Sequence, residues 1–351
     1  MDRPVLAITM GDPAGCGPEI TVKALRKPEV FAMCRPLVVG DANVFERTLR
    51  MLADVGVVPA GEFTVHRVKD PAEGIYEPGT IDVLHYDLID MDQFEWGKLS
   101  AQCGEAAFVC VTEAIRLAME GKVDGTVTNA LNKEAINLAG HHYSGHTEIY
   151  ADYTHTRDYA MMLAHGDLRV IHVSTHVALR EACDRVKKDR ILTCIRLADE
   201  ECRRQGVEHP RLAVAGLNPH AGEHGLFGRE EIDEIIPAIE EARRQGYDVT
   251  GPEPPDSLFS KARGGWYDCV VAMYHDQGHI PLKVVGFEYD REKQAWKAVQ
   301  GVNITLGLPI IRVSVDHGTA FDTSGRGIQN EDSLVNSIEF AARSAAGRKK
   351  E

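Results

Sequence analysis

DCVVAMYHDQG, residues 268–278, is an apolar run that ends on a histidine, His275. Two other runs end in the same way, VIHVSTHVALREA (170–182) at His176 and LAVAGLNPHAGE (212–223) at His220. Each histidine stands where a buried strand would give way to a loop. In open α/β sheets, ligands bind outside the carboxyl ends of the strands, so residues far apart in sequence can meet there. The three runs therefore predict a sheet with one functional edge.

The three histidines together predict a divalent-metal site at that edge. Imidazole suits zinc and similar borderline ions, and three protein ligands leave a coordination position open for a substrate. Such a site is more typical of catalysis than of a structural metal. A single histidine in this setting is more often an ordinary loop or core residue, and the metal is favoured because all three share the same strand-end context.

Alternating short strands and helices predict the fold class. β-branched runs bounded by Gly, Asn, Asp or Pro occur at residues 5–9, 37–40, 126–128, 170–174, 212–216, 269–274 and 310–315. Helix-period segments lie between several of them, for example residues 104–121 and 229–245. This alternation is typical of an α/β protein with a mostly parallel sheet and helices on both faces.

A chain of 351 residues suits one large α/β unit or two packed lobes. We expect a first lobe at residues 1–130 plus 305–351 and a second at residues 131–304. The polar segment 288–300 interrupts Gly-rich sequence and predicts an exposed hairpin or a short helix.

The composition favours a small-molecule partner. The 39 Lys and Arg against 53 Asp and Glu give a net charge of −14, which repels nucleic acid and anionic membranes. A few Arg and Lys residues inside a cleft can still bind a small anion. The eight cysteines form no CxxC pair and are typical of reduced packing thiols. With no export signal and no membrane-spanning stretch, we expect a soluble cytoplasmic protein.

Two loops carry further candidates. GDPAGCGPE (11–19) follows the first strand and lacks the GxGxxG order of a dinucleotide fingerprint, so a tight strand-to-helix turn and a ligand contact are equally open readings. In HHYSGHTEIYAD (141–152), the triplet His146, Thr147 and Glu148 can orient a polar substrate. The same stretch can be a capping turn in which Ser144 or Thr147 starts a helix, and the two readings are compatible.

The C-terminal third offers cations near strand ends. Arg312 lies between Ile311 and Val313, and a guanidinium buried in such a run needs an anionic partner. Lys283 can contact an anion as a point charge, although a lone Lys is usually a solvated surface residue. Asn303 precedes the run of Arg312, and Asp316 with His317 follows it as either a turn or a supporting pair. Asp256, on a Pro-rich loop, is either a metal ligand or base, or an N-cap.

Six motifs together resemble the 4-hydroxythreonine-4-phosphate dehydrogenase family, often called the PdxA family. They are GDPAGCGPE (11–19), GHTE (145–148), THVALREA (175–182), LNPHAGE (217–223), YHDQG (274–278) and GVNITLGLPIIRVSVDHGTAFD (301–322). The resemblance runs from about Ile8 to about Asp322. It implies an isocitrate/isopropylmalate-dehydrogenase-like two-lobed fold, a homodimer whose active site lies in the cleft between lobes, and NAD (or NADP) as oxidant.

The resemblance also implies the roles of particular residues. His176, His220 and His275 would bind the divalent metal (Zn²⁺, Mg²⁺, Mn²⁺ or Co²⁺), one of them from across the dimer interface. The family's substrate-binding positions fall on His146, Thr147, Lys283, Asn303 and Arg312. The reaction would be oxidation of a hydroxyl β to a carboxylate, followed by decarboxylation, with Asp256 and Lys283 as the candidate bases.

Three branches with different substrates fit these motifs. The family's name implies 4-phosphohydroxy-L-threonine, oxidised to 3-amino-2-oxopropyl phosphate. The long segment between Lys283 and Asn303, and the HIPLK wording at residues 279–283, look more like a paralogous branch that acts on 4-phospho-D-threonate or 4-phospho-D-erythronate. A third branch oxidises cis-dihydrodiols of aromatic carboxylic acids.

Two other functional classes remain open from the sequence. A zinc hydrolase could use the same three histidines with a bound water, but there is no HExxH-type pairing of ligands with a general base. A metabolite-binding protein without catalysis is suggested only by the lack of an obvious base, and the retention of all three candidate ligands argues against it.

Overall fold

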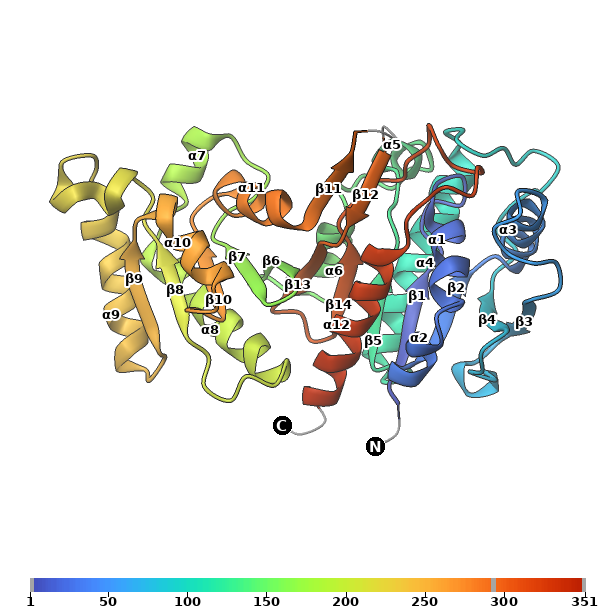
Figure 1. The fold of residues 1–351 in the computed structure, drawn as a ribbon, viewed down its shortest axis with the longest axis horizontal. Coiled ribbons are helices and arrows are strands. Elements are labelled where there is room, and N and C mark those ends of the chain that lie inside the picture. Colours follow the sequence, from blue (N-terminus) through green and yellow to red (C-terminus); the bar gives the residue numbers. More distant parts are fainter. Residues whose placement is uncertain (1–2, 292–294, 349–351) are drawn as a thin grey trace. The chain divides into compact units, whose positions relative to one another are not determined.

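The computed structural model describes residues 3–291 and 295–348 (Figure 1). The chain divides into two compact units. Unit 1 comprises Met1–Arg157 and Leu308–Ala345, and unit 2 comprises Asp158–Gly307 and Ala346–Glu351. Each unit contains both strands and helices. The predicted mostly parallel sheet with helices around it is confirmed.

In unit 1 the strands run in the order β3-β4-β2-β1-β5-β14, and every neighbouring pair is parallel. The strands are β1 (Val5–Thr9), β2 (Arg35–Gly40), β3 (Thr64–Val68), β4 (Thr80–His85), β5 (Gly125–Thr128) and β14 (Arg312–Val315). After β1 the chain proceeds to β2 on one side, and β5 lies on the other. This change of direction makes the carboxyl ends of β1 and β5 the topological switch point of unit 1.

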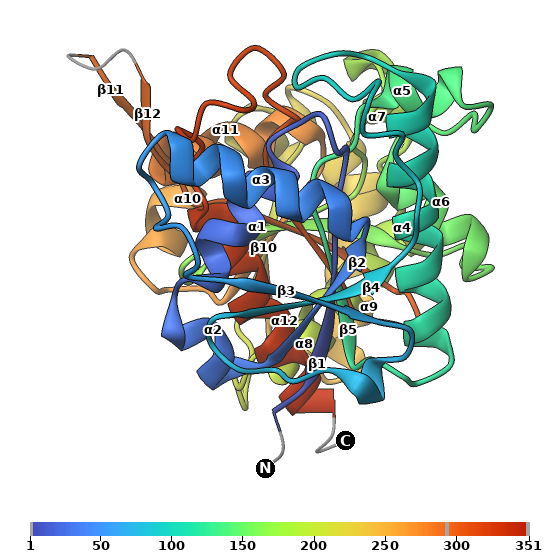
Figure 2. The same ribbon diagram turned by 90° about the vertical axis from the view of Figure 1, so that its right-hand side faces the viewer.

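The helices of unit 1 are α1 (Gly17–Leu25), α2 (Pro28–Met33), α3 (Ala42–Asp54), α4 (Ala101–Met119), α5 (Lys133–Leu138), α6 (His146–Tyr153) and α12 (Asp332–Arg348). A short 3-10 turn spans Pro71–Glu73. Figures 1 and 2 show α4 on one face of the strands and α1 with α12 on the other. All five residues of β1 are buried, as its place between two helical layers requires.

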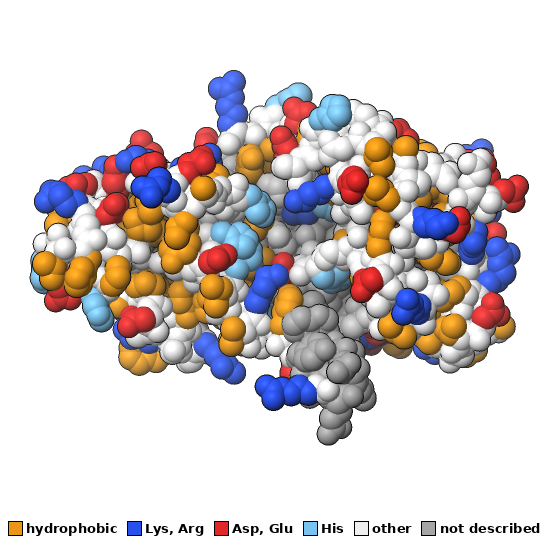
Figure 3. Space-filling view, turned by 90° about the horizontal axis from the view of Figure 1, so that it is seen from above, with side chains coloured by type: hydrophobic (Ala, Val, Ile, Leu, Met, Phe, Trp, Pro, Cys, Tyr) orange, Lys and Arg blue, Asp and Glu red, His pale blue; other side chains and the backbone are white. Residues whose placement is uncertain are grey.

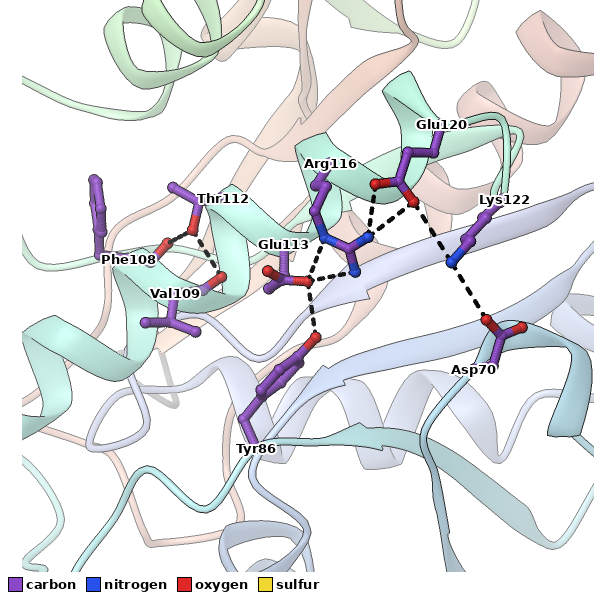
Figure 4. A network of polar contacts seen from close by, with 9 residues as sticks. All are labelled: Asp70, Tyr86, Phe108, Val109, Thr112, Glu113, Arg116, Glu120 and Lys122. Atoms are coloured by element: carbon purple, nitrogen blue, oxygen red, sulfur yellow. Dashed lines mark hydrogen bonds and ion pairs between the residues drawn. The ribbon is translucent and has the colours of Figure 1, made fainter.

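A polar network ties α4 to the segments beside it (Figure 4). The Tyr86 hydroxyl, just after β4, donates to Glu113 at 2.8 Å, and Arg116 donates to both Glu113 and Glu120. Lys122 continues the network to Asp70 at 3.4 Å. These groups are largely exposed, so they contribute modestly to stability and mainly fix the register of the helix.

Residues 131–157 belong to unit 1, although the sequence led us to expect them in the second lobe. The reason is that α5 and α6 pack on α4. Ile136, Ile149 and Tyr150 share one buried cluster with Phe108 and other α4 residues. This apolar contact places the change of unit after α6 at Arg157 instead of at residue 130.

In unit 2 the strands run in the order β13-β6-β7-β10-β8-β9. They are β6 (Ala160–His165), β7 (Leu168–His172), β8 (Leu212–Ala215), β9 (Val249–Glu253), β10 (Cys269–Ala272) and β13 (Val302–Leu306). The pairs from β7 through β10 and β8 to β9 are parallel, whereas β13 and β6 pair antiparallel at the other side.

The helices of unit 2 are α7 (Leu179–Asp184), α8 (Lys188–Arg204), α9 (Ile236–Arg244), α10 (Pro255–Arg263) and α11 (His275–Gly286). A tight turn, η2, spans Pro219–Gly225, and a π-helical turn, η3 (Glu231–Ile235), leads into α9. The predicted segment 288–300 forms a hairpin and not a helix: β11 (Phe287–Asp290) pairs antiparallel with β12 (Ala295–Val299), while residues 292–294 lie outside the described residues.

Two predictions from composition also have structural counterparts. All eight cysteines are free thiols, and every one except the half-buried Cys183 is buried. Among the described residues, no helix combines the length and the apolar character needed to cross a membrane.

Candidate functional site

The three predicted metal ligands follow three neighbouring parallel strands of unit 2. His176 lies beyond the end of β7, His275 beyond β10 and His220 beyond β8, and β10 lies between the other two strands. Because carboxyl ends of parallel strands meet at one edge, the three loops leave the sheet on the same side. Figure 3 looks onto the side where α11 lies in Figure 1, and histidine side chains gather there over unit 2.

His275 begins α11 and is the centre of a row of imidazoles. Its ring stacks on that of His279, with centroids 3.6 Å apart and planes at 13°. The ring of His176 lies 5.6 Å away from it on centroids, and His279 in turn lies 4.6 Å from His172. Nδ1 of His275 is 2.7 Å from Oδ1 of Asp276.

His172 and His279, the two buried rings of this row, are neutral. Burial, and after it the charge of neighbouring histidines, lowers the pKa of His172 to about 4 and lowers that of His279 still further. His172 Nδ1 donates to the Met161 carbonyl at 3.2 Å, whereas its Nε2 is buried and has no hydrogen-bond partner in the described part of the chain. His172 and His279 thus pack as uncharged aromatic groups, and His279 lies directly against His275.

His220 lies in the exposed turn η2, in a run of left-handed backbone from His220 (φ 52°) to His224 (φ 57°). L-residues in this conformation cost roughly 1–2 kcal/mol each, so contacts must hold the turn. The buried carboxylate of Glu231 supplies them by accepting the backbone N–H groups of Leu217 and Asn218, each at 2.8 Å. Glu231 also accepts from the Asn218 side chain at 2.9 Å.

The single chain does not bring the three histidines into one closed cluster. Within the described residues, the ligand atoms of His176, His220 and His275 do not all lie within 4.8 Å of one another. His176 and His220 are exposed and His275 is half-buried. The donor set nevertheless fits a divalent ion, because imidazole nitrogens on loops of one sheet edge are the ligands that such ions prefer.

In unit 1, Arg312 and His146 form a second candidate cluster. Arg312 begins β14, is 3% exposed, and donates from Nη2 to the Thr128 hydroxyl at 3.1 Å. Its guanidinium also lies 5.6 Å from the ring centroid of Tyr150. Burial lowers the pKa of Arg312 to about 10, so the group still carries its charge at neutral pH, and a bound anion would offset the cost of burying it.

His146 is the first residue of α6, and Gly145 precedes it as the N-cap with no side-chain cap. Neither Ser144 nor Thr147, the two predicted caps, is therefore the N-cap of this helix. Ser144 instead donates its N–H and its hydroxyl to the Glu148 carboxylate. Burial, and second the charge of Arg312, lowers the pKa of His146 far below its usual value. Its Nε2 is buried and unpartnered among the described residues, so a neutral imidazole is available to a ligand.

The remaining predicted residues occupy varied positions. Thr147 is half-buried in the first turn of α6. Asn303 is on β13, with a buried Oδ1 for which the described residues provide no donor. Lys283 lies in the last turn of α11, with Nζ 4.7 Å from the Phe287 ring centroid. Asp256 is exposed in the first turn of α10, where Pro254 and not Asp256 is the N-cap.

Two polar residues at the switch point of unit 1 were not predicted from the sequence. Asp12 lies in the loop after β1 and Asn129 in the loop after β5, both fully buried. Burial raises the pKa of Asp12 to about 7, although the Ala14 N–H donates to Oδ1. Asp12 Oδ2 and Asn129 Oδ1 have no partner in residues 3–291 and 295–348. The only available signal was Asp12's place in the GDPAGCGPE loop.

One group of three metal-capable side chains has its ligand atoms within 4.8 Å of one another: Asp41, His85 and Asp87 in unit 1. Backbone N–H groups already donate to Asp41 and to His85. Asp41 caps α3 through Asn43 N–H and accepts the N–H groups of Leu88 and Ile89. His85 Nδ1 accepts the Ala42 N–H at 3.1 Å. Asp41 and His85 are thus accounted for by these structural contacts, while the exposed Asp87 accepts from the Asn43 side chain at 3.4 Å.

Comparison with known proteins shows which family the chain as a whole resembles. The family model described as "Pyridoxal phosphate biosynthetic protein PdxA" matches residues 32–341. The D-threonate 4-phosphate dehydrogenase of Salmonella typhimurium is 50% identical over 341 residues, covering 97% of this chain and 99% of the relative.

Solved structures agree with the sequence comparison. A 4-hydroxythreonine-4-phosphate dehydrogenase from Burkholderia phymatum superposes with a TM-score of 0.83 at 44% identity, covering 98% of this chain and 99% of that one. A terephthalate 1,2-cis-dihydrodiol dehydrogenase from Burkholderia xenovorans is more distant, with a TM-score of 0.66 at 29% identity and coverages of 97% and 98%.

Proposed function

The chain belongs to the PdxA family of dehydrogenases, and we propose that it is a D-threonate 4-phosphate dehydrogenase that oxidises and decarboxylates this acid with NAD and a divalent metal. The observation that carries the choice of substrate is the 50% identity, over nearly the whole of both chains, to a relative of that name. A second relative of the same name, from Pectobacterium atrosepticum, supports it at 48% identity.

This choice reverses the order of the two phosphorylated substrates that the sequence motifs suggested. The family's name favoured 4-phosphohydroxy-L-threonine as the main substrate, whereas the curated relatives favour the alternative, 4-phospho-D-threonate. 4-Phosphohydroxy-L-threonine remains the second candidate, because similar solved structures carry that enzyme's name at 44–47% identity. The aromatic dihydrodiol is less favoured, since the structure of that name is 29% identical.

Arg312 and His146 are proposed to bind the anionic end of the substrate. A guanidinium presents parallel N–H donors that match two oxygens of a phosphate or carboxylate. Beside it, the neutral His146 can make one further hydrogen bond through its buried Nε2 without adding a second positive charge. We propose Thr147 and Asn303 as further polar contacts to the substrate.

His176, His220 and His275 are proposed to hold the metal, and the fit rests on their donor atoms following three adjacent strands of unit 2. A divalent ion held there would polarise the substrate's hydroxyl and, later, its carbonyl oxygen, while NAD would supply the hydride acceptor. Asp256 and Lys283 remain the proposed proton acceptors. Lys283 lies in the last turn of the helix that His275 begins, so about two turns of α11 separate the two residues.

The test is formation of reduced cofactor by the purified protein, with NAD or NADP and with Zn²⁺, Mg²⁺, Mn²⁺ or Co²⁺. The substrates are 4-phospho-D-threonate, 4-phospho-D-erythronate, 4-phosphohydroxy-L-threonine and an aromatic cis-dihydrodiol carboxylate. We expect the highest kcat/KM with 4-phospho-D-threonate, and release of carbon dioxide equal to the NADH formed.

Each other result would change the assignment. A higher kcat/KM for 4-phosphohydroxy-L-threonine would select the second candidate. Metal-dependent turnover without NAD would favour a hydrolase, and no turnover with any substrate would refute the oxidoreductase. We also propose that the protein is cytoplasmic and works as a homodimer. Light scattering at the assay concentration would test the oligomeric state.

A further inference from the structure

We propose that Thr128 is a positioning residue for Arg312: its hydroxyl directs the guanidinium to the edge of the unit 1 sheet where an anion can bind. The inference rests on the proposed function, which assigns Arg312 to the anionic end of the substrate. It deepens that function by naming the group that orients Arg312 before a ligand binds. The observation behind it is the 3.1 Å hydrogen bond from Arg312 Nη2 to the Thr128 hydroxyl, between two buried side chains.

The register of the sheet shows what this hydrogen bond does. Arg312 is the first residue of β14 and lies beside Thr126, whereas Thr128 is the last residue of β5. Side chains two residues apart in a strand point to the same face of the sheet, so Arg312, Thr126 and Thr128 share one face. Ligands of α/β sheets bind at the carboxyl ends of the strands. The hydrogen bond therefore brings the guanidinium from the amino end of β14 to the carboxyl end of β5.

Tyr150 also contacts the guanidinium. Its ring centroid lies 5.6 Å from the central guanidinium carbon of Arg312, within the range of a cation–π contact. The Tyr150 hydroxyl donates to Thr126 Oγ1 at 2.9 Å, and Thr126 donates in turn to the Ile311 carbonyl at 2.9 Å. These two hydrogen bonds fix the ring against β5 and β14. Thr128 and Tyr150 together restrict the guanidinium to a narrow range of orientations.

The same helix, α6, carries His146, the other proposed contact to the anion. His146 and Tyr150 are four positions apart, so they lie on one face of the helix. Because Tyr150 bonds to Thr126, the helix that presents His146 is anchored on β5, the strand that also carries Thr128. The parts of the anion site are thus in place without a ligand.

The expected size of the effect follows from the cost of ordering a side chain. An arginine that is free to move must be immobilised when a ligand binds, which typically weakens affinity about 2- to 10-fold. An arginine that is already oriented avoids that cost. Thr128→Val keeps the volume of the side chain and removes the acceptor of Arg312. We therefore expect the upper end of that range, about 10-fold weaker binding.

The experiment separates the hydroxyl of Thr128 from its contribution to packing. Isothermal titration of the metal-loaded protein with 4-phospho-D-threonate, without NAD so that no turnover occurs, compares the wild type, Thr128→Val, Thr128→Ser and Arg312→Gln. Thr48→Val is the matched control, because Thr48 is also fully buried in unit 1 and its hydroxyl donates to the Val44 carbonyl of its own helix. Circular dichroism and urea unfolding check that each variant is folded, and steady-state kinetics give KM and kcat.

Thr128→Val should weaken binding of 4-phospho-D-threonate about 10-fold and raise KM by a similar factor with kcat little changed. Thr128→Ser, which keeps the hydroxyl, and Thr48→Val should both bind like the wild type. The opposite order, with weaker binding in Thr128→Ser and none of that loss in Thr128→Val, would show that Thr128 only fills space and would overturn the inference.

The Arg312→Gln variant distinguishes a failure of this inference from a failure of the proposed function. Loss of binding in Arg312→Gln with wild-type binding in Thr128→Val would overturn the role of Thr128 and leave the proposed anion site standing. Wild-type binding in Arg312→Gln, or no binding of 4-phospho-D-threonate by the wild type, would overturn both.

Discussion

Asp12 is a fully buried carboxyl group at the carboxyl end of β1, and burial raises its pKa from 3.8 to about 7. The folded protein therefore keeps a proton that the unfolded chain releases. A raised pKa stabilises the folded state below pH 3.8, and that contribution is lost as the pH rises towards about 7. The shift corresponds to about 4 kcal/mol between the two limits.

Asp12→Asn should remove this pH dependence, because an amide stays neutral at every pH. We expect the variant to gain stability relative to the wild type between pH 5 and pH 8, although the Asn side chain loses part of the bond with Ala14 N–H. Urea unfolding at pH 5 and at pH 8 measures the free energy of unfolding of the variant and of the wild type. Asp248→Asn, at an exposed position, is the control, and an equal difference between wild type and Asp12→Asn at both pH values would show that Asp12 is already ionised.

Sequence reasoning located residues that have a clear local signal. Arg312 stands between two apolar residues and is buried, and His176, His220 and His275 each follow a strand of the sheet, as their apolar runs predicted. Asp12 was not found, because a Gly- and Pro-rich loop normally lies on the surface. Here the segment after β14 covers that loop, with Cys16 N–H donating to the Thr319 carbonyl. Such a contact between distant segments has no local signal.

At the scale of elements, Glu231 of η3 holds the strained turn η2 that carries His220. Its carboxylate accepts three N–H groups from Leu217 and Asn218, and it is 2% exposed. Glu231→Gln keeps the shape but turns one acceptor into a donor that faces the Asn218 amide. Leaving a buried donor without a partner costs about 1–3 kcal/mol.

We therefore expect Glu231→Gln to lower the free energy of unfolding by about 1–3 kcal/mol and to increase proteolysis at residues 217–225. Limited digestion with mapping of the cut site measures the second effect. Glu240→Gln is the control, because Glu240 is an exposed glutamate on α9. If Glu231→Gln and Glu240→Gln were cut equally slowly, the hydrogen bonds of Glu231 would not be what holds η2.

The seven predicted strands all appear, within a few residues at their ends, as β1, β2, β5, β7, β8, β10 and β14. The structure adds three strands that are mostly buried and were not predicted, β4, β6 and β13. It also adds two edge strands: β3 of unit 1, whose residues are mostly exposed or half-buried, and β9 of unit 2, which contains Gly251 and Pro252. Edge strands tolerate polar residues and proline because one side of the strand needs no partner. Their sequences therefore lack the signal of a buried strand.

At the scale of the whole molecule, the cores and the proposed metal ligands are separate. The buried apolar residues of unit 2 lie on its strands and helices, for example Leu163, Val170 and Leu258 in one cluster. His176 and His220 lie on exposed loops beyond the strand ends. A metal held there would orient the substrate and contribute little to the packing that keeps each unit folded.

Removing the metal should therefore abolish turnover and leave the fold intact. We expect chelation of the purified protein to eliminate NADH formation while the far-ultraviolet circular dichroism stays unchanged. Added metal should restore activity and raise the unfolding temperature only as mass action on a folded-state ligand requires. His220→Ala should behave like the chelated protein even with metal present, because one of three ligands is missing. Global unfolding on chelation would instead mean that the metal is structural, as in domains whose folding depends on a bound ion.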